Sequence, residues 1–210
     1  MNPIAVALVW GIAGAACGWF ARWGSVKLAR LEGLEPGFKT WQVYGPPILA
    51  AVLFAVFGYE LHGALALLAL RSLFVLVLVQ VIFFDFEHHI ILDRIMFPAM
   101  AVALVVSLFA QPWWAGLATG FGAGLLFFVL AVLGSAVLKQ EALGFGDVKL
   151  AAFMGLLLGV PLIFSALFYG VLFAGLGAIV FIVWHRSVRG NIAYGPYLAA
   201  GALLALYFLP

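Results

Sequence analysis

Long apolar runs separated by short polar intervals dominate the sequence. A helix needs roughly 20 predominantly apolar residues to cross a bilayer. By that measure eight runs are candidate spans: about 4–20, 44–59, 63–84, 95–110, 115–137, 149–160, 161–184 and 193–209. The sixth run is short and shares Gly159, Val160 and Pro161 with the seventh, so that boundary is soft. The pattern predicts an all-α, polytopic membrane protein with about eight transmembrane helices, forming one domain over residues 1–210.

Composition strengthens this interpretation. The chain is 67% hydrophobic and 9% charged, whereas a soluble domain has about 45–50% apolar and about 25% charged residues. The first apolar run has no basic segment before it, so we interpret it as a retained membrane helix rather than a secretory signal. Cys17 is the only cysteine, which excludes an internal disulfide and a zinc site built from several thiolates. The net charge of +2 does not indicate a nucleic-acid partner, and none is expected.

The basic residues predict the orientation of the chain. Nine of them fall in odd-numbered intervals between the spans: Arg22, Lys27, Arg30, Lys39, Arg94, Lys139, Lys149, Arg186 and Arg189. Lys and Arg concentrate on the cytoplasmic side, so these intervals are predicted to be cytoplasmic and both termini to lie outside. Residues 21–43 are then a short cytoplasmic loop. The tenth, Arg71, lies within the third run, where we expect a structural tie to backbone carbonyls or to a carboxylate of another helix.

Two of the cytoplasmic intervals carry aspartates that directly border an apolar run. Asp85 ends the third apolar run, and Asp147 follows two glycines, Gly144 and Gly146, in the turn before the sixth. Two carboxylates that converge in a low-dielectric site cannot both ionise easily, so one can act as base and the other as acid on a single water. This is the chemistry of an aspartic protease. The glycines would let the backbone approach closely and leave room for an extended peptide.

These residues carry a family resemblance. The heptapeptide GFGDVKL, residues 144–150, resembles the GxGD signature of intramembrane aspartic proteases and, with its Lys and Leu, that of type IV prepilin peptidases. The segment from Asp85 to Asp93 repeats that family's spacing between its first and last acids, although Leu92 stands where proline is usual. The closing segment IAYGPYLAAGALLAL is also similar, and the resemblance covers roughly residues 63–209.

The resemblance implies a bacterial inner-membrane peptidase in which Asp85 and Asp147 are the catalytic pair. Its partners would be membrane lipids and its substrates, the prepilins or pseudopilins of type IV pili or type II secretion. It would cut their leaders at the cytoplasmic face, after glycine and before a hydrophobic helix, without a cofactor. Many members carry an insert with two CxxC pairs after the first span, associated with N-methyltransferase activity. Residues 21–43 contain no cysteine, so we expect that second activity to be absent or much reduced.

Five further residues are candidates for substrate binding or for support of the pair: Gly144, Gly146, Lys149, Glu87 and Asp93. We expect Asp93 to cap the helix that follows it, with substrate contact as the alternative. Glu87 is expected to be a solvated or supporting charge. Lys149 could favour the ionised form of Asp147 or bind a headgroup phosphate.

The adjacent histidines, His88 and His89, raise the question of a metal site. On a helix, Asp85, His88 and His89 would share one face, at i, i+3 and i+4. A zinc protease would need a pattern such as H-E-x-x-H, which the chain lacks. We therefore expect no metal and interpret both histidines as polar residues at headgroup level.

Two other functions would fit the same carboxylates. An ion- or proton-coupled transporter would use them as carriers, but it predicts acids near the membrane midplane and an internal repeat. Both acids lie near the ends of spans, and the sequence has no convincing repeat. A non-enzymatic assembly factor could also retain the fold without the activity, and an intact aspartate pair argues against that alternative.

Overall fold

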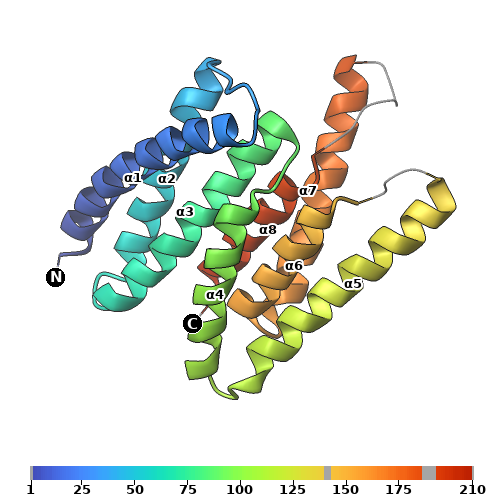
Figure 1. Cartoon of the computed structure of the whole chain (residues 1–210). Coiled ribbons are helices and arrows are strands. Elements are labelled where there is room, and N and C mark those ends of the chain that lie inside the picture. The colour runs from blue at the N-terminus through green and yellow to red at the C-terminus, as the bar shows by residue number, and fades with distance from the viewer. Residues whose placement is uncertain (1, 140–142, 186–192, 210) are drawn as a thin grey trace. The chain divides into compact units, whose positions relative to one another are not determined.

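The computed structural model describes residues 2–139, 143–185 and 193–209, and every regular element in these ranges is a helix (Figure 1). The eight helices are α1 (Pro3–Leu31), α2 (Thr40–Glu60), α3 (Leu65–His88), α4 (Asp93–Phe109), α5 (Trp114–Leu138), α6 (Phe145–Leu158), α7 (Leu162–His185) and α8 (Gly195–Tyr207). The prediction of an all-α fold is confirmed.

Five of the described helices are long and apolar enough to cross a membrane: α1, α2, α3, residues 114–137 of α5 and residues 162–181 of α7. The protein is therefore an all-α, multi-pass membrane protein. The other three are shorter, with 17 residues in α4, 14 in α6 and 13 in α8. The count of eight spans and the orientation stay predictions, and Arg186 and Arg189 lie outside the described residues.

The first helix is longer than its apolar run predicts. α1 continues through the first charged residues to Leu31, so the predicted loop 21–43 is wrong for its first half, and only residues 32–39 connect α1 to α2. Arg, Lys, Leu and Ala are good helix formers, and they dominate this extension. The helix ends where Gly33 adopts a positive φ of 72°. With 29 residues, α1 is about 43 Å long, which exceeds the roughly 30 Å of a hydrocarbon core.

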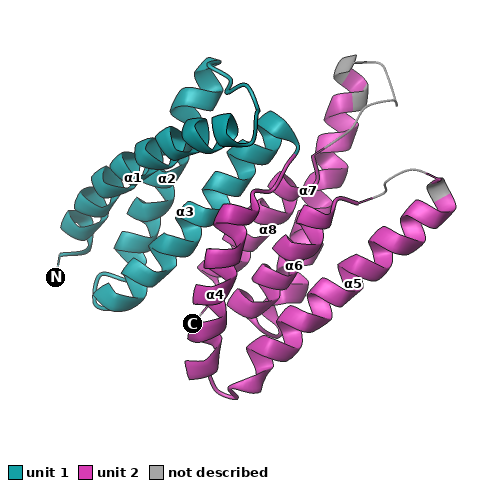
Figure 2. Ribbon diagram, viewed as in Figure 1, with its two compact units in different colours: residues 1–89 teal, residues 90–210 magenta. Residues whose placement is uncertain are grey.

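The chain divides into two compact units, residues 1–89 and 90–210, where the sequence suggests one domain (Figure 2). In the first unit α1 packs along α2 through small residues. A Cβ added to Gly18 would lie 2.6 Å from the Cα of Pro47, so only glycine permits this approach. Arg71 of α3 is buried in this unit, and its tie to backbone carbonyls or to a carboxylate stays a prediction.

In the second unit, α5 and α6 also approach closely at a glycine. A Cβ added to Gly155 would lie 2.4 Å from the carbonyl oxygen of Thr119, and the Thr119 hydroxyl donates to the Gly155 carbonyl at 2.8 Å. Close backbone approach lets a hydroxyl bond across two membrane helices. The packing holds the short α6, whose first turn carries Asp147, against a long neighbouring helix.

Candidate active site

Asp85 lies in the last turn of α3, where its residue is only 5% exposed. The sequence suggests a turn from this residue onward, but α3 continues to His88. It ends because His89 adopts the left-handed conformation, at φ 55° and ψ 36°, and donates its N–H to the Asp85 carbonyl at 2.9 Å. Asp85 is therefore presented by a helix end and not by a solvated loop.

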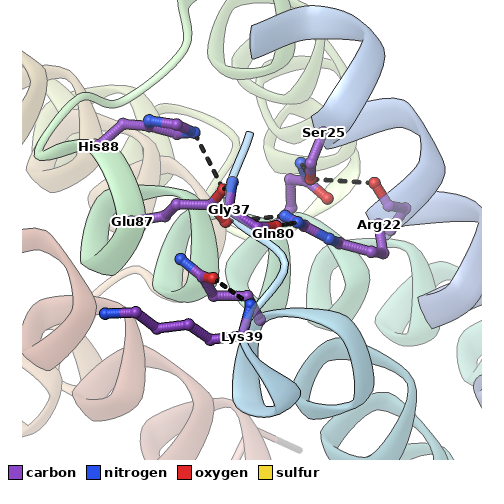
Figure 3. Close-up of polar contacts among 9 residues, drawn as sticks. Arg22, Ser25, Gly37, Lys39, Gln80, Glu87 and His88 are labelled. Atoms are coloured by element: carbon purple, nitrogen blue, oxygen red, sulfur yellow. Dashed lines mark hydrogen bonds and ion pairs between the residues drawn. The ribbon is translucent and has the colours of Figure 1, made fainter. Parts of the chain in front are cut away.

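Glu87, two residues later, is the centre of a buried polar cluster that we define by Arg22, Gly37 and Glu87 (Figure 3). The Nη1 of Arg22 donates to the Oε2 of Glu87 at 2.7 Å. The backbone N–H of Gly37 donates to the other carboxylate oxygen, and the Nη2 of Arg22 donates to the Gly37 carbonyl. The Glu87 side chain is 3% exposed. The expectation that it could be solvated is wrong, and the alternative, a supporting charge, remains.

Two further polar contacts lie beside this cluster. His88 places its Nε2 3.3 Å from the Oε1 of Glu87 and packs its ring on Phe84, with the centroids 4.6 Å apart. The Gln80 amide donates to the Ser25 hydroxyl, which adds a second link between α3 and α1 (Figure 3). The described residues contain no group of three or more His, Cys, Asp or Glu side chains that could hold a metal.

Asp147 lies in the first turn of α6 and is 8% exposed. The predicted GFGD turn is helical from Phe145 onward, with Gly144 as the residue that precedes the helix. The Asp147 N–H donates to the Gly144 carbonyl at 3.0 Å. The first turn of a helix carries partial positive charge, so it favours a carboxylate at this position.

The two glycines before Asp147 differ in how tightly they are packed. A Cβ added to Gly146 would lie 3.0 Å from the Cβ of Ile91, so glycine lets the start of α6 pack against that residue. A Cβ added to Gly144 would come no closer than 3.5 Å to the Oδ2 of Asp147, an ordinary contact. Close packing therefore requires glycine at position 146 more than at 144.

Asp93 and Lys149 form a contact that the sequence does not predict. Asp93 is the first residue of α4, and Leu92 occupies the capping position without a side-chain hydrogen bond, so the predicted N-cap role of Asp93 is wrong. The Nζ of Lys149 instead lies 2.5 Å from the Oδ1 of Asp93, whose side chain is 54% exposed. The same Nζ lies 5.1 Å and 5.0 Å from the ring centroids of Phe97 and Phe145. Lys149 thus ties α6 to α4.

Tyr194 lies close enough to Asp147 to interact with its charge, a proximity that the aspartate motifs do not predict. It directly precedes α8, which begins at Gly195. Burial raises the pKa of Tyr194, and the negative charge of Asp147 raises it further. A phenol is already protonated at neutral pH, so a raised pKa leaves Tyr194 a hydrogen-bond donor.

The two candidate catalytic aspartates belong to different units of the chain. Asp85 is in residues 1–89 and Asp147 in residues 90–210. Each is buried at the end of a helix, and each has an ion pair two residues away, Glu87 with Arg22 and Lys149 with Asp93. Their convergence stays a prediction from the sequence.

The chain is an all-α, multi-pass membrane protein with a buried aspartate in each half, and comparison with known proteins identifies its family. Residues 72–182 match the type IV leader peptidase family, and the chain belongs to this family. It is 33% identical over 165 residues to a prepilin leader peptidase/N-methyltransferase of Bacillus subtilis (strain 168). That match covers 77% of this chain and 64% of the relative's length. No solved structure matches the chain.

Proposed function

We propose that this protein is a membrane aspartic endopeptidase that removes the leader peptides of type IV prepilins or pseudopilins, with Asp85 and Asp147 as its catalytic pair. One observation carries the proposal. The family match spans residues 72–182 and so includes both aspartates, and each of them is buried in a terminal turn of its helix in the described structure.

The chemistry needs both acids at once. One carboxylate, ionised, takes a proton from water as the water oxygen attacks the carbonyl carbon of the scissile peptide. The other, protonated, gives its proton to the carbonyl oxygen, and a tetrahedral intermediate results. When the C–N bond breaks, the leaving nitrogen takes the proton that the first carboxyl gained from water. The second carboxylate recovers a proton from a hydroxyl of the intermediate as the carbonyl re-forms, and the new N-terminus is released. Two carboxylates that share one proton suit this exchange of roles.

The location and the substrate class follow from the same proposal. The protein would lie in a bacterial inner membrane, and the arrangement of basic residues supports a cytoplasmic location for the C-terminal end of α3 and the start of α6. A prepilin presents its leader on that side, and its hydrophobic helix lies in the bilayer. Cleavage would fall after glycine and before that helix. Gly146 lets the start of α6, which carries Asp147, pack closely against Ile91.

We propose the peptidase activity alone. N-methyltransferase is part of the printed name of the Bacillus subtilis relative. The segment between α1 and α2 is only residues 32–39, and the sole cysteine, Cys17, lies in α1. A cysteine-built metal module cannot form from one thiol.

The test uses purified full-length protein in detergent with a prepilin substrate. Wild-type protein is expected to release the leader after glycine, whereas Asp85→Asn and Asp147→Asn should each abolish release, because an amide can neither take nor share the proton. Glu60→Gln is the control, since it makes the same carboxylate-to-amide change at an exposed residue outside the candidate site. Leader release that survives in either dyad variant would refute the assignment. Added S-adenosylmethionine should leave the new N-terminus unmethylated.

A further inference from the structure

The buried polar cluster of Arg22, Gly37 and Glu87 lies at the helix end that presents Asp85, and the peptidase chemistry does not use it directly (Figure 3). Glu87 comes two residues after Asp85 in the last turn of α3. Side chains two residues apart project about 200° apart around a helix. Glu87 therefore faces α1 and the 32–39 segment, while Asp85 projects from a different face.

The last turn of α3 has little intrinsic stability. The last four carbonyls of a helix have no partner within the helix, and helix ends fray. A left-handed residue that ends a helix is most often glycine, but here it is His89. Contacts from outside the helix must therefore hold the turn that carries Asp85.

The buried polar cluster supplies those contacts from two directions. Both oxygens of Glu87 are used: Oε2 accepts from the Arg22 guanidinium and Oε1 from the Gly37 N–H. Arg22 closes the ring by donating to the Gly37 carbonyl. A planar guanidinium with a fixed fork of donors can satisfy two acceptors at once. The side chains are 9% exposed for Arg22 and 3% for Glu87, so water competes weakly with these bonds.

We propose that Arg22 and Glu87 are positioning residues: the cluster that they form with Gly37 fixes the rotation of the last turn of α3 and so the direction of the Asp85 carboxylate. This inference rests on the proposed function for its consequence, the rate of cleavage. Its structural content, an anchored helix end, is independent of that function.

The experiment compares Glu87→Gln with a matched variant of the same helix. Glu87→Gln keeps the shape and one acceptor but loses the charge that holds Arg22. Ser72→Ala removes another buried polar contact of α3, the 2.7 Å bond from the Trp10 indole N–H. It acts 13 residues from Asp85, about 20 Å along the helix. Cleavage kinetics are measured well below the unfolding temperature of each variant.

A misdirected carboxylate slows the chemical step, because catalysis depends on near-attack geometry. We expect Glu87→Gln to lower kcat about tenfold or more and to change KM by less than about twofold. Ser72→Ala should retain wild-type kcat even where its unfolding temperature falls. Glu87→Asp keeps the charge with a shorter reach, so it should fold well and still lower kcat by several-fold. Amide hydrogen exchange over residues 82–89 should accelerate in both Glu87 variants and not in Ser72→Ala.

Wild-type kcat in Glu87→Gln, or an equal loss of kcat in Ser72→Ala, would overturn the positioning role. If wild-type protein cleaves no prepilin, the proposed function is refuted but the anchoring of the helix end is not. Hydrogen exchange then decides the anchoring alone: faster exchange over residues 82–89 in the Glu87 variants upholds it, and unchanged exchange there overturns it.

Discussion

The two halves of the chain hold their aspartate-bearing helix ends in opposite ways. In residues 1–89, Asp85 ends a 24-residue helix, and the neighbouring ion pair of Arg22 and Glu87 is almost fully buried. In residues 90–210, Asp147 lies in the first turn of a 14-residue helix. Of the neighbouring ion pair, Lys149 and Asp93, the Asp93 side chain is half-exposed. Both pairs join segments more than 50 residues apart in sequence, so both were invisible to local patterns.

The difference in burial decides what each pair contributes. A buried pair is costly to disrupt, because removing one partner leaves an unbalanced charge in a medium that solvates it poorly. An exposed pair contributes little, since water and salt compensate either partner. The first unit therefore presents its aspartate from an anchored helix end. The second unit relies instead on backbone packing of α6 against α5 and on the hydrogen bonds of a first helical turn.

Cross-linking gives the sharpest test of whether the two helix ends form one site. In a Cys17→Ala background, Asp85→Cys with Asp147→Cys should be joined almost completely by a short thiol-reactive cross-linker in membranes, because a shared water requires the two positions to be close. Mass spectrometry of the digested protein would detect the linked peptides. The reagent is preferable to direct oxidation, since a disulfide tolerates only a narrow separation of the Cα atoms.

The matched control pairs Glu60→Cys with Asp147→Cys. Glu60 ends α2, and the orientation predicted from the basic residues places it on the opposite membrane face from Asp147. This pair should remain unlinked under the same conditions. If the 85–147 pair also stayed unlinked, the two aspartates could not share a water, and the catalytic pair would have to be reassigned.

The next largest effect should come from removing one partner of the buried pair of Arg22 and Glu87. Arg22→Met leaves the Glu87 carboxylate buried without its guanidinium, and we expect a loss of about 3–5 kcal/mol in the free energy of unfolding. For a chain of this size that corresponds to a fall of about 10 °C in the unfolding temperature. Thermal unfolding in detergent, followed by tryptophan fluorescence, measures the fall.

The double variant Arg22→Met/Glu87→Gln tests the reason for that loss. With both charges removed, it should be more stable than Arg22→Met alone, although it carries one more substitution. Stability no better than that of the single variant would mean that the charge imbalance is not the cause.

The apolar pattern predicted the helices well and their polar contacts poorly. Eight runs correspond to eight described helices, because burial in a bilayer demands long apolar segments whatever the fold. The two acids were found because each interrupts or borders such a run. Arg22, by contrast, contributes only its charge to the sequence prediction, although the structure buries it. A charge that follows an apolar run looks solvated in the sequence, but α1 continues past it.

The errors share one physical origin. Local rules predict a cap at Asp93 and permit a solvated Glu87, because they describe a residue by its neighbours in sequence. Their actual partners, Lys149 and Arg22, are 56 and 65 residues away. Such pairings depend on how helices pack, which one sequence does not encode in any local pattern. Glycine spacing offered a partial signal, since small residues mark helix contacts in membranes.

The smallest effect should come from the exposed pair in the second unit. Asp93→Asn keeps the shape of the side chain and removes its charge, so it should lower the free energy of unfolding by only about 0.2–1 kcal/mol. Lys149 would keep its contacts with the rings of Phe97 and Phe145, which limits the loss. At about 1 M salt the Debye length is about 3 Å, so the difference from wild type should vanish, whereas that of Arg22→Met should persist. A salt-resistant loss of several kcal/mol in Asp93→Asn would mean that the Lys149–Asp93 pair stabilises the fold as strongly as the buried Arg22–Glu87 pair. The contrast between the two halves would then not hold.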